Sequence, residues 1–182
     1  MENFSFVEAG CASCFTELGT VYHLWTPENF QLIFTCEDDF KYGMSIFGLC
    51  AGMFPDVVIL TFELMSNHLH VTAAGRKDRI LELFELIKCM LKRYCSARGY
   101  LIDWTLFMAL TRPILELDDV RNVIAYDNRN GFVVCPDETP FSYRWGANRY
   151  YFNPDAKCRA SENSSGMTIR DKRMFSHSHI FD

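Results

Sequence analysis

The chain has 182 residues, of which 49% are hydrophobic and 15% aromatic, enough for one domain with a substantial buried core. No apolar run is long enough to span a bilayer, and the first ten residues carry two acids and no base, unlike a signal peptide. We therefore expect a cytoplasmic protein that makes no membrane contact and keeps its eight cysteines reduced.

The net charge of −5 is unevenly distributed along the chain. Residues 1–63 contain nine acids and one base, for a net −8, whereas residues 64–182 contain 17 bases and 14 acids, for a net +3. A global acidic balance therefore does not exclude a local surface that binds phosphate. The basic residues that we predict to contact DNA, if nucleic acid is the partner, are Lys92, Arg93, Arg121 and Arg129.

Apolar residues follow strand and helix periodicities in turn along the chain. In chain order they predict strands at 4–9, 20–26, 57–64, 69–72 and 101–111. Helices are predicted at 38–53, 79–98 and 118–129, with Gly99 and Gly131 closing the last two. Pro113 is expected to interrupt the chain between the last strand and the last helix.

This mixed order of elements predicts an α+β fold, in which helices pack on one face of a mainly antiparallel sheet. We expect the domain to cover residues 1–153. Within it, residues 141–153 form a packed connector that is rich in aromatic residues. The polar segment 154–182 is predicted to be a C-terminal arm or the start of a further region.

The segment from Asp56 to Ala74 carries the clearest candidate site. Two apolar runs flank a polar break, which predicts a hairpin whose second strand begins with the sequence HLH. Because side chains alternate along a strand, His68 and His70 share one face and Leu69 points to the other. Two adjacent imidazoles on a strand suit a divalent metal, and packed histidines are the alternative. His23, in the strand at 20–26, is either packed or exposed near that strand, or it lies close to this pair.

The predicted helix at 118–129 leads into a second candidate. Tyr126 and Asn130 are four residues apart, so a helix places them on one face. The alternative is structural, with the tyrosine packed and the asparagine capping the helix before Gly131.

Together these segments resemble the single-tyrosine HUH transposases, most of all the REP-associated tyrosine transposases. Residues 62–71, FELMSNHLHV, are similar to that family's M-P-N-H-x-H motif, with Ser66 in place of proline. Residues 126–131, YDNRNG, are similar to its Y-x-x-x-N motif, although the glycine here follows the asparagine directly. Residues 139–143, TPFSY, are similar to a later P-x-S-S-Y motif. The three motifs occur in the family's order.

The resemblance implies a ferredoxin-like, RRM-like HUH nuclease fold and a transposase that cleaves and rejoins single-stranded or hairpin DNA. Tyr126 would be the nucleophile that forms a 5′-phosphotyrosine, with His68, His70 and Asn130 as ligands of Mg²⁺ or Mn²⁺. Some relatives act as homodimers, so a homodimer is one possible state. The alternative function is a domesticated, catalytically inactive module that binds hairpin DNA. A metal-dependent enzyme unrelated to DNA is a third reading.

Overall fold

The computed structural model describes residues 19–134 and 142–147. The predicted strand at 4–9 and the predicted arm at 154–182 lie outside these ranges, as does most of the predicted connector. Within the described part, no helix combines the length and the apolar character that crossing a membrane requires.

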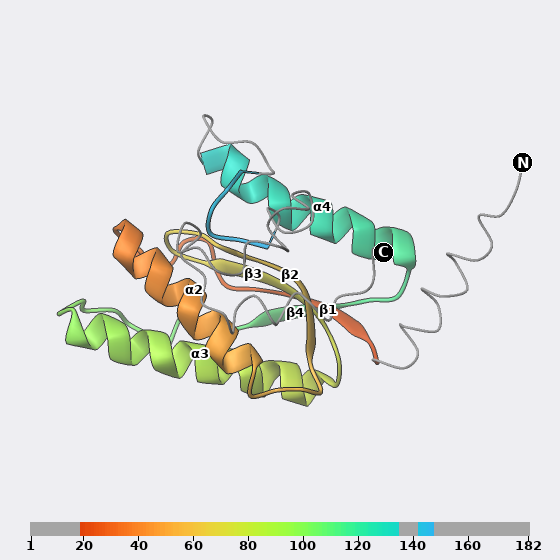
Figure 1. Ribbon diagram of the computed structural model, residues 1–182, viewed down its shortest axis with the longest axis horizontal. Coiled ribbons are helices and arrows are strands. Elements are labelled where there is room, and N and C mark those ends of the chain that lie inside the picture. The colour runs from red at the N-terminus through yellow and green to blue at the C-terminus, as the bar shows by residue number, and fades with distance from the viewer. Residues whose placement is uncertain (1–18, 135–141, 148–182) are drawn as a thin grey trace, which may run out of the picture.

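The described strands form one antiparallel sheet with the order β2-β3-β1-β4. Figure 1 shows this sheet at the centre of the molecule. The strands are β1 (Val21–Trp25), β2 (Val58–Leu64), β3 (Leu69–Ala74) and β4 (Leu110–Ile114). β2 and β3 form the predicted hairpin, and β1 inserts between β3 and β4 although it comes first in the chain among the described strands.

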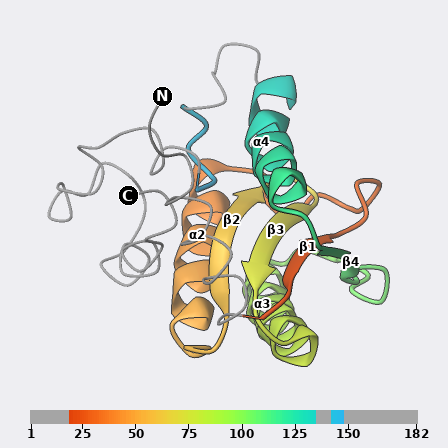
Figure 2. The same cartoon turned by 90° about the vertical axis from the view of Figure 1, so that its right-hand side faces the viewer.

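The helices cover both faces of the sheet (Figure 2). α2 (Glu37–Ala51) and α3 (Lys77–Ala97) lie on one face, which we call the α2/α3 face. α4 (Leu117–Val134) lies on the other, the α4 face. The predicted α+β class with a mainly antiparallel sheet is confirmed. We predicted that helices would cover only one face of the sheet, whereas in the structure they cover both.

The two faces of β3 explain this arrangement. Leu69, Val71 and Ala73 enter the large apolar core beneath α2 and α3. The residues between them, His70 and Thr72, are buried as well but are polar. They face α4, so this helix covers polar residues that require hydrogen-bonding partners as well as apolar ones.

β4 begins and ends later than the strand predicted at 101–111. Residues 101–109 form an irregular segment, and its Trp104 and Phe107 both turn into the core although they are three residues apart. The strand predicted at 101–111 would place Trp104 and Phe107 on opposite faces, but both side chains are buried in the core. Pro113 lies inside β4 opposite Tyr22. β4 is an edge strand of this sheet, where a residue without an N–H is tolerated.

Candidate functional site

The two histidines of the hairpin lie side by side at the start of β3. The chain turns at Ser66 and Asn67, and His68 follows the turn. Leu69 then begins β3 and is buried in the core. His68 and His70 therefore point to the α4 face. Their ring centroids are 5.1 Å apart and their planes nearly perpendicular, at 79°. The structure thus brings together these two residues of the predicted metal site.

Asn67 holds the ring of His68. Its Oδ1 lies 2.8 Å from His68 Nδ1, and its Nδ2 donates to the backbone carbonyls of Glu28 and Phe30. Because a carboxamide oxygen only accepts, this network assigns the ring proton of His68 to Nδ1. His68 Nε2 then keeps its lone pair for a ligand.

Two further buried residues surround His70. His23 Nε2, from β1, is 3.1 Å from Asp127 Oδ1 and 3.4 Å from His70 Nδ1. Asp127 Oδ1, from α4, is 3.7 Å from the same His70 Nδ1. The hydroxyl of Thr72 donates to the other carboxylate oxygen, Asp127 Oδ2, at 2.9 Å. We call His23, His70 and Asp127 the inner tripod.

Sequence reasoning left the role of His23 open and did not assign Asp127. A signal for Asp127 was nevertheless present, because it lies four and seven residues after the apolar Val123 and Val120. Helical periodicity places all three on one face of α4, and both valines are buried. A carboxylate on a buried helical face needs partners, but the sequence alone does not show which strands supply them.

Burial keeps the histidines of the hairpin neutral at pH 7. Burial, together with neighbouring His68 and His23, lowers the pKa of His70 to about 3. Burial also lowers the pKa of His68, although the charge of Glu28 opposes this shift. Neutral imidazole is the form that binds metals. The cost of burying a charge also raises the pKa of the Asp127 carboxyl.

Tyr126 lies next to the inner tripod. Its side chain is 49% exposed, and its ring stands edge-on to His70 and His23, with centroid distances of 5.8 and 6.4 Å. A phenol that borders two buried imidazoles and also reaches solvent is accessible to a substrate. The hairpin and α4, separate in sequence, therefore meet at His70.

Asn130 lies one turn further along α4 and is partly buried. Its Nδ2 is enclosed and has no hydrogen-bond partner among the described residues. The backbone N–H of the next residue, Gly131, donates to Glu63 Oε1 at 3.2 Å. Glu63 is the residue on β2 that pairs with His70 on β3. The helix next to Asn130 is thus attached to the strand position opposite His70.

Gly131 does not end the helix as predicted, since α4 continues to Val134. A Cβ atom at this position would lie 2.2 Å from Cγ of Tyr143. Tyr143 also donates its hydroxyl to the carbonyl of Leu64 at 2.7 Å. The glycine is therefore required by the close approach of this ring rather than by a helix end. Residues 139–141 of the third motif lie outside the described ranges.

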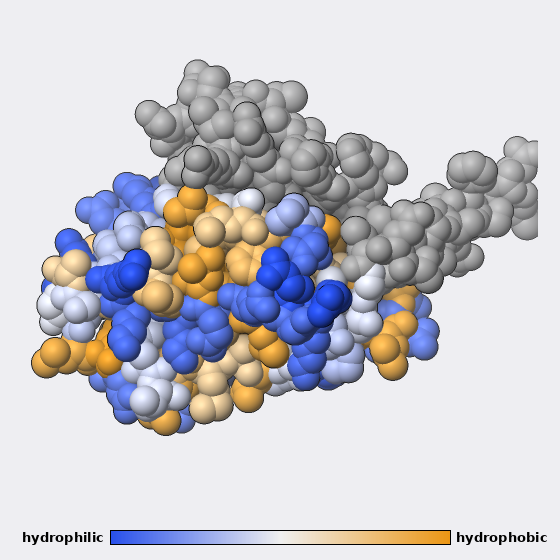
Figure 3. All heavy atoms as spheres, turned by 90° about the horizontal axis from the view of Figure 1, so that it is seen from below, coloured by the Kyte–Doolittle hydropathy of each residue, from blue (hydrophilic) through white to orange (hydrophobic). Residues whose placement is uncertain are grey.

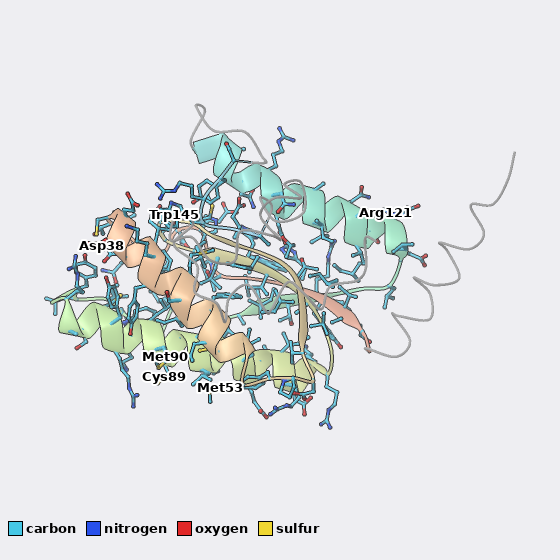
Figure 4. The ribbon with its side chains drawn as sticks, viewed as in Figure 1. Asp38, Met53, Cys89, Met90, Arg121 and Trp145 are labelled. Atoms are coloured by element: carbon cyan, nitrogen blue, oxygen red, sulfur yellow. The ribbon has the colours of Figure 1, made fainter. Side chains whose placement is uncertain are left out.

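The predicted DNA-binding residues are divided between the two faces of the sheet. Arg121 and Arg129 are exposed on α4, and Arg121 forms an ion pair with Asp118 at 3.0 Å. Figure 4 places Arg121 near the start of α4. Lys92 and Arg93 are exposed on α3, so they lie across the sheet from Tyr126.

Two sets of residues in the described part have donor atoms close enough to bind one metal ion. The first is the inner tripod, and the second, the outer trio, consists of Glu28, His68 and His70. Both combine two imidazoles with one carboxylate, a donor set that suits divalent transition metals. His70 Nε2 is buried and has no hydrogen-bond partner among the described residues, and Asp127 Oδ1 is buried beside His23 Nε2 at 3.1 Å. The residues present therefore fit a divalent metal.

No protein-family model and no curated protein matches this sequence. A solved structure, that of a REP-associated tyrosine transposase bound to a REP hairpin, is similar with a TM-score of 0.54 and 13% sequence identity. The similarity covers 72% of this chain and 78% of that chain. At this identity the comparison concerns the fold, and the two proteins have the same α+β fold.

Proposed function

We propose that this protein is a metal-dependent nuclease and strand transferase that cleaves single-stranded or hairpin DNA through Tyr126. The observation that carries the proposal is the position of Tyr126, half exposed and edge-on to the buried His70 ring at 5.8 Å. The fold that it shares with a transposase bound to a DNA hairpin supports the same reading.

The chemistry assigns a role to each residue. The Tyr126 hydroxyl oxygen attacks the phosphorus of a DNA phosphodiester, a P–O bond forms, and the P–O3′ bond breaks. The phenol loses its proton, the leaving 3′ oxygen gains one, and the 5′ phosphate stays on the tyrosine. A 3′-hydroxyl from another strand end can reverse this attack, so joining needs no ATP. Such a reaction suits the transposition of short DNA elements.

A divalent metal, Mg²⁺ or Mn²⁺, would neutralise the charge of the phosphate oxygens. His70 is the residue that both candidate ligand sets share. The family resemblance names His68 and Asn130 as the other ligands. Two imidazoles favour Mn²⁺ over Mg²⁺, which prefers oxygen. Arg129, exposed and close to Tyr126 on α4, is suited to hold a neighbouring phosphate.

Covalent capture tests the nucleophile. The protein is incubated with labelled single-stranded oligonucleotides that carry hairpins, with Mn²⁺, and separated under denaturing conditions. We expect a protein–DNA adduct that disappears in Tyr126→Phe. Tyr42→Phe is the matched control, because Tyr42 packs on Tyr94 on the other face of the sheet. It should form as much adduct as the wild type.

An adduct that persists in Tyr126→Phe would exclude this tyrosine as the nucleophile. Hairpin binding without an adduct in the wild type, at any sequence tried, would instead favour the catalytically inactive DNA-binding module.

A further inference from the structure

We propose that the inner tripod of His23, His70 and Asp127 is a binding site for a divalent transition metal. This proposal names the ligands of the metal on which the proposed function depends. It differs from the set that the family resemblance implies, since only His70 is common to both. The tripod also draws its residues from β1, β3 and α4, so a bound metal would join three elements of the fold.

The distances within the tripod match those between ligands of one metal ion. Its three donor atoms are separated by 3.1, 3.4 and 3.7 Å. Ligands bound at about 2.0–2.1 Å in tetrahedral geometry lie roughly 3.4 Å from one another. All three residues are buried, with exposures of 8% for His23, 2% for His70 and 0% for Asp127. Their positions are therefore fixed by packing, as a rigid metal site requires.

Hydrogen bonds alone do not satisfy these three atoms. His23 Nε2 has at most one proton, which serves either His70 Nδ1 or Asp127 Oδ1. If it serves Asp127 Oδ1, the nearer atom at 3.1 Å, His70 Nδ1 has no donor, and if it serves His70 Nδ1 at 3.4 Å, Asp127 Oδ1 has none. In either case one buried polar atom has no partner, which is costly. One cation satisfies all three lone pairs together.

The surroundings also favour a metal. Thr72 donates to Asp127 Oδ2, which orients the carboxylate and leaves Oδ1 directed at the two histidines. Trp25 stacks on His23, with ring centroids 4.9 Å apart, and fixes the plane of that imidazole. Such supporting contacts around the ligands are typical of metal sites. Tyr126 borders both imidazoles, so the site adjoins the proposed nucleophile.

Cobalt titration without DNA tests the proposal. The whole 182-residue chain is stripped with a chelator and titrated with Co²⁺, whose visible absorption reports binding and coordination geometry. We expect one Co²⁺ per chain. His23→Ala and Asp127→Asn should each weaken binding by more than about a hundredfold, since even supporting residues cost up to that much. The exposed Asp119 on the same helix provides the matched control, and Asp119→Asn should bind as the wild type does.

His68→Ala separates the two ligand sets. If the tripod holds the metal, this variant should weaken cobalt binding by less than about tenfold, as expected for a neighbour outside the ligands. Circular dichroism and the thermal midpoint of each metal-free variant show whether it is folded. Loss of binding in His68→Ala with retention in folded His23→Ala would overturn the tripod, as would a wild type that binds no Co²⁺. Because no DNA is present, either result is independent of the adduct assay.

Discussion

Glu63 places a carboxyl group between the sheet and α4 with no access to solvent. Burial, with added repulsion from Asp127, raises the pKa of this carboxyl to about 8. The hydrogen bond from the Gly131 N–H lowers this pKa but does not outweigh burial. One of its oxygens, Oε2, has no partner among the described residues. The α4 face thus contains buried polar groups that lower the stability of the fold because their hydrogen bonds are incomplete.

We expect Glu63→Gln to stabilise the metal-free protein more as the pH rises. The unfolded chain loses this proton near pH 4.5, whereas the folded chain keeps it to about pH 8. Between these values the unfolded state binds fewer protons, so the stability of the wild type falls as the pH increases. Glutamine does not ionise and removes this loss. The gain at about pH 8 should exceed that at about pH 5 by on the order of 3 kcal/mol.

Urea denaturation at the two pH values measures this difference. Glu85→Gln, at an exposed position on α3, is the matched control and should keep the pH dependence of the wild type. An equal pH dependence in Glu63→Gln and the wild type would show that Glu63 ionises normally in the folded state.

At the scale of elements, α4 is attached to the sheet in two different ways. Its first half packs Val120 and Val123 against apolar residues of the strands. Its second half makes polar contacts instead, among them Thr61 to Asn128 at 3.2 Å and the hydrogen bond from Gly131 to Glu63. The second half also contains Tyr126 and the ligand Asp127, so the position of the site depends on close packing around it.

Gly131→Ala tests this packing. In an isolated helix alanine is more favourable than glycine by about 1 kcal/mol. Here the added Cβ would lie 2.2 Å from Tyr143 Cγ, so we expect a net destabilisation of about 2 kcal/mol. Gly52→Ala is the matched control, since its nearest atoms would lie at 3.5 Å and its backbone is helical. Denaturant unfolding measures the free energy of unfolding of both variants and of the wild type. An increase in stability for both variants would contradict the close approach of Tyr143.

At the scale of the whole molecule, the two faces of the sheet differ in what they can offer DNA. The α4 face has Tyr126 together with Arg121 and Arg129. The α2/α3 face is covered by two helices over the main core. Figure 3 looks onto that side and shows hydrophilic and hydrophobic residues intermingled across it. A DNA strand bound at Tyr126 would pass over the α4 face and would not reach Lys92 or Arg93 on α3.

We therefore expect Arg129→Ala to weaken hairpin binding and Lys92→Ala to leave it unchanged. Removing one phosphate contact should reduce the slope of log affinity against log salt by about 1. Fluorescence anisotropy over a range of salt concentrations measures both variants, with the wild type as reference. An equal reduction in Lys92→Ala would show that DNA also contacts the α2/α3 face.

The features that depend only on neighbouring residues could be predicted from the sequence. The hairpin, the positions of His68 and His70 on one face, and the end of α3 near Gly99 follow from strand alternation and helix-ending chemistry. Each of these signals is contained within a few residues. The α+β class follows in turn from the order of the elements.

The convergence of distant residues depends on how the strands and helices pack together. The tripod needs β1 beside β3 in one register and α4 over both, and His23 and Asp127 are 104 positions apart in the sequence. The requirement for glycine at position 131 depends in the same way on Tyr143, which is twelve positions away. Periodicity predicts which face a side chain occupies, whereas the partner on that face depends on strand order and helix placement. For this reason the histidine pair was evident in the sequence, but the carboxylate beside it was not.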